Sequence, residues 1–516
     1  MTLNNDSRTV NASKNVSSAL INKLIILCLT FISRKIFIRY IGVEYLGING
    51  LFANVLTLLS MADLGIETAM NVSLYKPIAE NNLKRISALL NYFRKVYYVI
   101  AVAVLGLGLI LIPFLKYIVN LDQEIPNLYL FYVIFVIKNC VSYLFVYKSA
   151  IIRADQKSYV VNRVDIIVNI CKVAFQVLSI TLYKSYLVYI LLEAVAVIIH
   201  NICVSIIADR NYRFIKNREN LDQNEKRLIF QDTSSVFLYK VSRSLIIGTD
   251  NILLSVLFGT VSVGLYSNYH TVTHTLITFV TLLFTSLTAS VGNLVATKSS
   301  DQRYKVFDCM QMISFWLCGI LSISLFFLIQ DFIVIWLGEK MLMDDATMIA
   351  IVINVFFSCC MRPVWTFREG TGMYRQIRFI MLVTAALNLI LSIVLGKLIG
   401  ISGVFFATSI SKLSTYFWYE PQILFRDFFA KPIKKYYMNY LNNFILMLII
   451  VACLYMPMKL IDGTHIVTWL LKAVICFVVI NFVYWIRYRK TEQFDDFKKR
   501  ILSMKNRLFS KRMSAH

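Results

Sequence analysis

Six cations lie inside long apolar stretches of the 516-residue sequence, where an ionisable group is costly. They are Lys23, Arg34, Lys138, Lys172, Arg243 and Lys412. Because buried ionisable groups normally face a bundle interior or a water-filled cavity, this excess of positive charge favours a cavity that binds an anion. Phosphate fits best, since Arg offers a planar fork of donors and Lys a compact charge.

The same cations have a simpler interpretation, in which each one reaches a lipid headgroup or pairs with a neighbour. For Lys23 and Arg34, which lie near the ends of their stretch, this alternative stays open. Lys172, Arg243 and Lys412 lie deeper, and for them we favour the cavity.

Four further side chains are candidates for coupling transport to an ion gradient: Asp250, Glu193, His270 and His274. The two histidines have the spacing of zinc ligands but lack the acidic partner of an HExxH motif, so we predict no metal site. They could instead titrate near neutral pH, as a proton-coupled carrier requires. We expect no cofactor beyond a coupling ion, H⁺ or Na⁺, because no G-x4-GK-[ST] motif for ATP occurs.

The elements that position these groups are apolar blocks of about 20 residues, long enough to cross a bilayer. With 58% hydrophobic and only 16% charged residues, the composition rules out a soluble globular enzyme and a disordered chain. We predict an all-α polytopic membrane protein with about fourteen transmembrane helices. Their predicted ranges are 16–38, 46–70, 96–115, 127–147, 161–182, 185–207, 233–258, 264–294, 308–329, 346–361, 377–398, 401–424, 439–458 and 466–486.

The net charge of +24 reflects topology rather than nucleic-acid binding. Of the 53 Lys and Arg residues, 39 fall on one alternating set of connections and termini, against 8 on the other set. By the positive-inside rule, both termini are then cytoplasmic. We therefore predict a multi-pass membrane protein that has no nucleic-acid partner.

A short pattern occurs twice, 217 residues apart: Gly42-x4-Gly47 between the first two predicted spans, and Gly259-x4-Gly264 between the seventh and eighth. Its position predicts two six-helix halves, a layout typical of transporters. The predicted domains are a cytoplasmic segment (1–15), an N-lobe (16–207), a linker (208–232), a C-lobe (233–424), two additional helices (439–486) and a basic tail (487–516). In the tail, Phe494, Phe497, Ile501, Met504 and Leu508 have the spacing of an amphipathic helix, which we expect to lie on anionic membrane lipids.

Six segments of the sequence match a known family: FIRYIGVEYLGINGLF (37–52), ADLGI (62–66), SLYKP (73–77), VGLYSNY (263–269), SVGNL (290–294) and IGISGV (399–404). In these segments the chain resembles bacterial polysaccharide flippases of the Wzx type, which belong to the multidrug/oligosaccharidyl-lipid/polysaccharide (MOP) exporter superfamily. The resemblance covers nearly the whole chain, and it carries little information about which sugar is exported.

The resemblance implies a MATE-like fold of two six-helix lobes around a cationic cavity, with alternating access and no catalysis. The implied substrate is an undecaprenyl-diphosphate-linked oligosaccharide, moved to the outer leaflet of a bacterial cytoplasmic membrane for capsule, O-antigen or related polysaccharides. We expect a monomer that works beside a polysaccharide polymerase or assembly protein. Two alternatives are a multidrug exporter, to which a basic cavity is poorly suited, and a membrane polymerase, which would need a larger external loop.

Overall fold

The computed structural model describes residues 8–63, 66–120, 125–217 and 219–499, and within these ranges every regular element is a helix. This confirms the predicted all-α fold. By its internal contacts the chain divides into two compact units, residues 1–267 and 268–516. The predicted domain boundaries stay a prediction.

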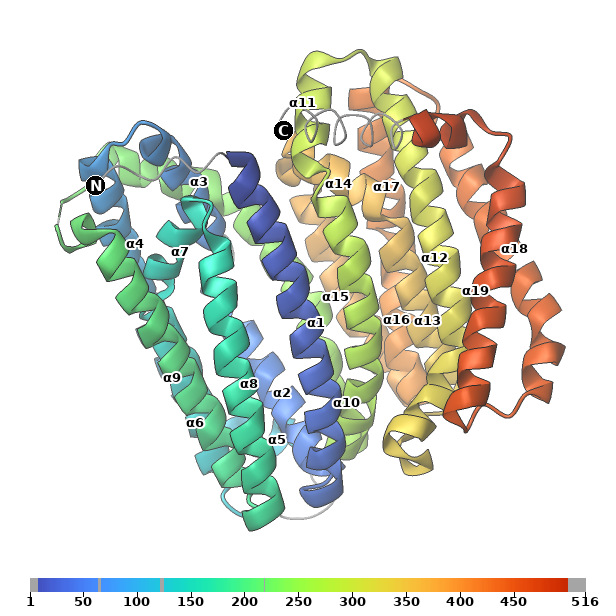
Figure 1. Cartoon of the computed structure of the whole chain (residues 1–516), viewed down its shortest axis with the longest axis horizontal. Coiled ribbons are helices and arrows are strands. Elements are labelled where there is room, and N and C mark those ends of the chain that lie inside the picture. The colour runs from blue at the N-terminus through green and yellow to red at the C-terminus, as the bar shows by residue number, and fades with distance from the viewer. Residues whose placement is uncertain (1–7, 64–65, 121–124, 218, 500–516) are drawn as a thin grey trace, which may run out of the picture. The chain divides into compact units, whose positions relative to one another are not determined.

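The first unit contains α1 to α9 and most of α10. Its helices are α1 (Arg8–Tyr40), α2 (Val43–Leu59), α3 (Ile66–Ala79), α4 (Leu83–Ile110), α5 (Leu115–Ile118), α6 (Leu128–Tyr143), α7 (Val146–Ala154), α8 (Ser158–Tyr183), α9 (Tyr186–Asn211) and α10 (Gln223–Thr285), of which α10 continues into the second unit. Neighbouring helices pack in the order α1, α8, α9, α6, α4, as Figure 1 shows for α8, α9 and α6. This order places the ionisable residues of α6, α8 and α9 close to one another.

The second unit contains the end of α10 and the remaining helices. These are α11 (Thr288–Thr297), α12 (Ser300–Leu337), α13 (Asp345–Cys360), α14 (Arg362–Thr371), α15 (Tyr374–Ile399), α16 (Ile401–Ser414), α17 (Tyr416–Leu424), α18 (Lys434–Leu460) and α19 (Ile466–Tyr488). α12 packs against α13 and α19, and α16 packs against α13 and α15 (Figure 1).

Eight helices in the described ranges are long and apolar enough to cross a membrane, or up to ten if each of two bent pairs is one span. Helices occupy all fourteen predicted ranges, but several of these helices are short or broken, so the number fourteen is not confirmed. Predicted span 46–70 contains most of α2 and the first residues of α3, and predicted span 401–424 contains α16 and α17. The protein is thus a polytopic helical membrane protein with interrupted spans.

One region predicted as a connection proves to be helical. Residues 362–371 form α14, which follows α13 at an angle of 43° and begins with Arg362 and Pro363. Since Pro lacks the N–H that a helix interior needs, it favours the start of a new helix over continuation of the old one. Arg362 and Arg368, which lie in the predicted connection between spans 346–361 and 377–398, are buried.

The repeated glycine pattern forms a close crossing of α2 and α10 within the first unit. Gly42 precedes α2 at φ 107°, ψ 163°, and Gly259 divides α10 into two limbs at φ 84°, ψ 165°, so both occupy the same region, which favours glycine. The second glycine of each pattern lies at the crossing. A Cβ on Gly47 would lie 1.9 Å from the Thr260 carbonyl oxygen, and one on Gly264 would lie 2.3 Å from that of Val43. The two copies therefore pack reciprocally, backbone against backbone.

The tail prediction is only partly within the described residues. Residues 492–499 are helical, and Phe494 is buried in a stack with Trp316. Ile501, Met504 and Leu508 lie outside the described residues, so the amphipathic surface helix stays a prediction.

Candidate functional site

The first unit holds an ion pair between two residues that the sequence marked. Lys138 on α6 and Glu193 on α9 lie 2.7 Å apart, Nζ to Oε1, with side chains 17% and 25% exposed. The ammonium also lies 4.2 Å from the centre of the Phe135 ring. Because α6 and α9 pack along their length, the two side chains meet between the helices rather than at a helix end.

A second lysine shares this acid. Lys172 on α8 is half-buried, and its charge interacts with those of Glu193, Lys138 and Asp165. Lys138 and Lys172 therefore lie near the Glu193 carboxylate, and the Asp165 carboxylate is a second acid within electrostatic reach of Lys172. A positive balance, which an anionic ligand requires, depends on a third cation.

Arg34 on α1 adds a third cation to Lys138 and Lys172. Its Nη1 donates to the Ser267 hydroxyl at 2.9 Å, and its charge interacts with the Tyr189 hydroxyl of α9. Tyr189 in turn lies within electrostatic reach of Glu193, one helical turn further along α9. Arg34, Lys138, Lys172 and Glu193, which we call the unit 1 charge cluster, are thus linked across α1, α6, α8 and α9.

Sequence reasoning missed an adjoining acid and its neighbours. Asp165 on α8 lies 3.2 Å from Nε2 of His200 on α9, and it accepts a hydrogen bond of 3.3 Å from Asn22 of α1. Asp165 and His200 both fall inside predicted spans, 161–182 and 185–207. The criterion of depth that selected Lys172 would have selected them as well.

The first unit contains three more of the predicted site residues. Lys23 is exposed on α1 and Arg243 is exposed on α10. Asp250 is buried on α10, where its charge interacts with the Tyr266 hydroxyl. The predicted roles of these three residues stay predictions.

In the second unit, His270 and His274 are exposed on α10, with their rings stacked at a centroid distance of 5.3 Å. Lys412 is half-buried on α16. The structure therefore places the two histidines and the lysine on different helices, and their predicted roles stay open.

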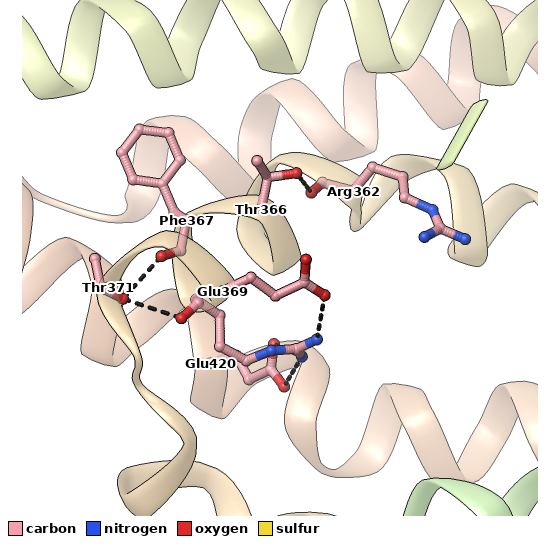
Figure 2. Close-up of polar contacts among 7 residues, drawn as sticks. Arg362, Thr366, Phe367, Glu369, Thr371 and Glu420 are labelled. Atoms are coloured by element: carbon pink, nitrogen blue, oxygen red, sulfur yellow. Dashed lines mark hydrogen bonds and ion pairs between the residues drawn. The ribbon is translucent and has the colours of Figure 1, made fainter. Parts of the chain in front are cut away.

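The deepest charges of the second unit form a pair that the sequence did not reveal. Nη1 of Arg368 on α14 lies 3.0 Å from Oε1 of Glu420 on α17, with side chains only 2% and 0% exposed. Glu369 approaches the same guanidinium at 3.8 Å (Figure 2). Arg362 is also buried, 4.9 Å from the Trp365 ring centre. Glu420 lies in predicted span 401–424, so its depth in the membrane could have marked it as a candidate. Arg368 gave no such signal, because it lies in a predicted connection.

The Arg368–Glu420 pair and the unit 1 charge cluster differ in their ability to bind an anion. The Arg368 guanidinium is held by two carboxylates, so it stabilises the packing of α14 on α17. The unit 1 charge cluster has more cations than anions, so a phosphate group that displaced Glu193 from Lys138 would gain charge-assisted hydrogen bonds. The cluster is therefore the better candidate for an anion site.

Comparison with known proteins identifies a family to which most of the first unit is similar. A family whose description is polysaccharide biosynthesis protein matches residues 12–291. A comparison with curated proteins finds no match.

Solved transporter structures share the fold at low sequence identity. The lipid II flippase MurJ, in an inward closed conformation, is 15% identical, with a TM-score of 0.62 over 92% of this chain and 99% of its own. An inward-facing multidrug resistance MATE family transporter of the MOP superfamily is 10% identical, with a TM-score of 0.59 over 78% of this chain and 98% of its own. The Vibrio cholerae MATE transporter VcmN, in the bent form, is 13% identical, with a TM-score of 0.54 over 81% of this chain and 98% of its own.

Proposed function

Because the chain belongs to the polysaccharide biosynthesis protein family, we propose that it is a flippase for undecaprenyl-diphosphate-linked oligosaccharide repeat units. The fold of MOP superfamily transporters supports this proposal. Within this chain the proposal rests on the positive balance of the unit 1 charge cluster, where Arg34, Lys138 and Lys172 outnumber Glu193 and the adjoining Asp165.

In this proposal the diphosphate binds the cluster while the polyprenyl tail stays in lipid. A diphosphate approaching Lys138 competes with Glu193 for the ammonium, so binding releases the carboxylate. A released carboxylate at membrane depth takes up a proton or Na⁺ more readily than a paired one. Glu193 could therefore couple substrate binding to an ion gradient, with alternating access between the two membrane faces.

The competing function is export of small cationic molecules, as the fold of MATE transporters allows. A cation would be repelled by the unit 1 charge cluster, so the cluster favours the anionic substrate. We further propose that the protein lies in the bacterial cytoplasmic membrane with both termini in the cytoplasm, and that it contributes transport rather than catalysis.

The test is translocation in proteoliposomes that contain a fluorescent undecaprenyl-diphosphate-linked oligosaccharide. Movement is measured as the fraction of label that becomes accessible to an impermeant quencher. We expect Lys172→Gln to slow movement by about tenfold, which corresponds to the loss of one charge-assisted contact of roughly 1.4 kcal/mol. Lys397→Gln, an exposed lysine at the end of α15, removes the same charge and should transport normally.

Two outcomes would contradict the proposal. Normal transport by both Lys172→Gln and Lys138→Gln would remove the cationic mechanism. Wild-type protein that leaves the labelled lipid in place but expels a cationic dye would favour the multidrug function instead.

A further inference from the structure

The first unit has a cavity away from the unit 1 charge cluster, between α4 and the segment that leads into α10. Its volume is about 380 Å³. The segment is held against α4 by two side chains of that helix: the Ser87 hydroxyl donates to the Asn217 carbonyl, and Asn91 Nδ2 donates to the Glu219 carbonyl at 3.0 Å. These hydrogen bonds fix the segment in place, so that residues 219–226 form one wall of the cavity.

One part of the cavity is cationic and polar. Lys95 of α4 and Lys226 of α10 both line it, together with the amide of Asn220. None of the described residues that line it is acidic. The segment itself has three acids: Glu225 is 2.9 Å from Arg85 in an ion pair, and Glu219 and Asp222 are exposed and do not line the cavity. Two ammonium groups and an amide are the donors that a phosphate prefers.

The other part of the cavity is apolar and continues onto a lipid-facing surface. Val96 and Val99 line it, and Val99 is 70% exposed. Val102, three residues further along α4, is also 70% exposed, and α4 is one of the candidate membrane spans. Apolar residues exposed on a membrane span normally contact acyl chains. A hydrocarbon chain leaving the cavity would therefore remain in lipid.

We propose that this cavity binds an anionic phospholipid, with the phosphate between Lys95 and Lys226 and one acyl chain along Val99 and Val102. The pairing of a cationic pocket with an apolar exit matches the two parts of such a lipid. The site lies on the exposed face of α4 rather than among the charges of α6, α8 and α9, so it is distinct from the proposed transport site and does not depend on it. A bound lipid would bridge α4 and the start of α10.

The test uses the detergent-purified, delipidated full-length protein. Its thermal unfolding is measured with phosphatidylglycerol, with phosphatidylcholine and with inorganic phosphate at the same concentration. Phosphatidylglycerol should raise the Tm by several degrees, because a ligand that binds only the folded state stabilises it. Phosphatidylcholine and inorganic phosphate should have little effect. The double variant Lys95→Gln/Lys226→Gln should lose most of the shift.

The matched control is Lys84→Gln/Lys116→Gln, which removes two exposed lysines of the same unit that do not line the cavity. An equal loss of the shift in this control, or an equal shift with phosphatidylcholine or inorganic phosphate, would overturn the proposal.

A second measurement remains informative if the double variant does not fold. Photoactivatable phosphatidylglycerol is cross-linked to the wild-type protein, and the adducts are mapped by mass spectrometry. Adducts within residues 88–102 and 219–226 would support the site. Adducts confined to other helices would contradict it.

Discussion

At the scale of single residues, the buried ion pair of Arg368 and Glu420 stabilises the packing of two helices. The two side chains are 2% and 0% exposed and lie 3.0 Å apart. Each alone would be an uncompensated charge in a region of low dielectric, where the penalty is several kcal/mol. Together they hold α14 against α17, two helices that each follow a break in the chain.

Glu420→Gln is expected to lower the free energy of unfolding by about 3–5 kcal/mol, because it leaves the Arg368 guanidinium buried without its main partner. Glu369→Gln serves as the matched control. Since Glu369 is 30% exposed and 3.8 Å from Arg368, its loss should cost less than about 1 kcal/mol. Thermal unfolding in detergent measures both, and equal effects would show that Glu420 has no special role.

A second residue-scale prediction concerns Tyr212, which lies just beyond the end of α9. Its hydroxyl donates to Asp155 Oδ2 at 2.7 Å, and burial, reinforced by the Asp155 charge, raises the pKa of Tyr212 above its ordinary value of 10.0. A raised pKa gives stability that is complete below pH 10 and is lost as the pH rises further, because the unfolded chain releases the proton first.

Tyr212→Phe should therefore cost about 1.5–3 kcal/mol at pH 8, as expected for a hydrogen bond to a charged acceptor. The difference in Tm between wild type and variant should shrink between pH 9.5 and pH 11. A difference that stays constant over this range would contradict the assigned hydrogen bond.

At the scale of elements, the crossing of α2 and α10 depends on the absence of side chains at two positions. The nearest atom that a Cβ would meet at each of Gly47 and Gly264 is a backbone carbonyl oxygen, which cannot move without shifting a helix. Gly50, one turn further along α2, faces only the Val263 side chain, at 3.7 Å. Close backbone approach is typical of helix pairs that pack through small residues in membranes.

Gly47→Ala should destabilise the protein by about 1–3 kcal/mol or more, because the added methyl overpacks the crossing. Gly50→Ala adds the same methyl at ordinary van der Waals distance and should be nearly neutral. Unfolding and transport measured side by side would separate a stability effect from a functional one. Similar losses in the two variants would show that helix propensity rather than the crossing is responsible.

The sequence predicted where the helices lie along the chain better than it predicted which helices pack together. Long apolar blocks predicted helices in every expected range, because span length is a local property. The break between α16 and α17 was missed because residues 401–424 were predicted as one span, and α14 was missed because its charged residues indicated a connection. In the candidate site, Lys138, Lys172 and Glu193 were identified by depth alone. Their grouping could not be predicted, because it depends on which helices pack together.

At the scale of the whole molecule, the distribution of charge along the chain predicts its orientation. With 39 of 53 basic residues on one alternating set of connections and termini, each connection has an assigned side. Ser299, between α11 and α12, belongs to the cytoplasmic set, and His465, between α18 and α19, belongs to the opposite set. Both side chains are exposed, so each can report its side.

One cysteine introduced at each of these positions in turn tests the orientation. We expect His465→Cys to react with an impermeant maleimide in intact cells, and Ser299→Cys to react only after permeabilisation. The unsubstituted protein gives the background from its ten native cysteines. Reaction of Ser299→Cys in intact cells would reverse the proposed topology.

The glycine crossing also has a consequence for the order of events during synthesis. Gly47 and Gly264 are 217 residues apart, which a ribosome translates in about 10 to 40 s at 5–20 residues per second. For nearly all of that interval α2 is already made, while the limb of α10 that packs against its glycine face has not been synthesised. A nascent chain that stops at residue 211 would have all of α1 to α9 but lack this partner. Completion of the first unit must therefore wait until translation has passed the end of that unit.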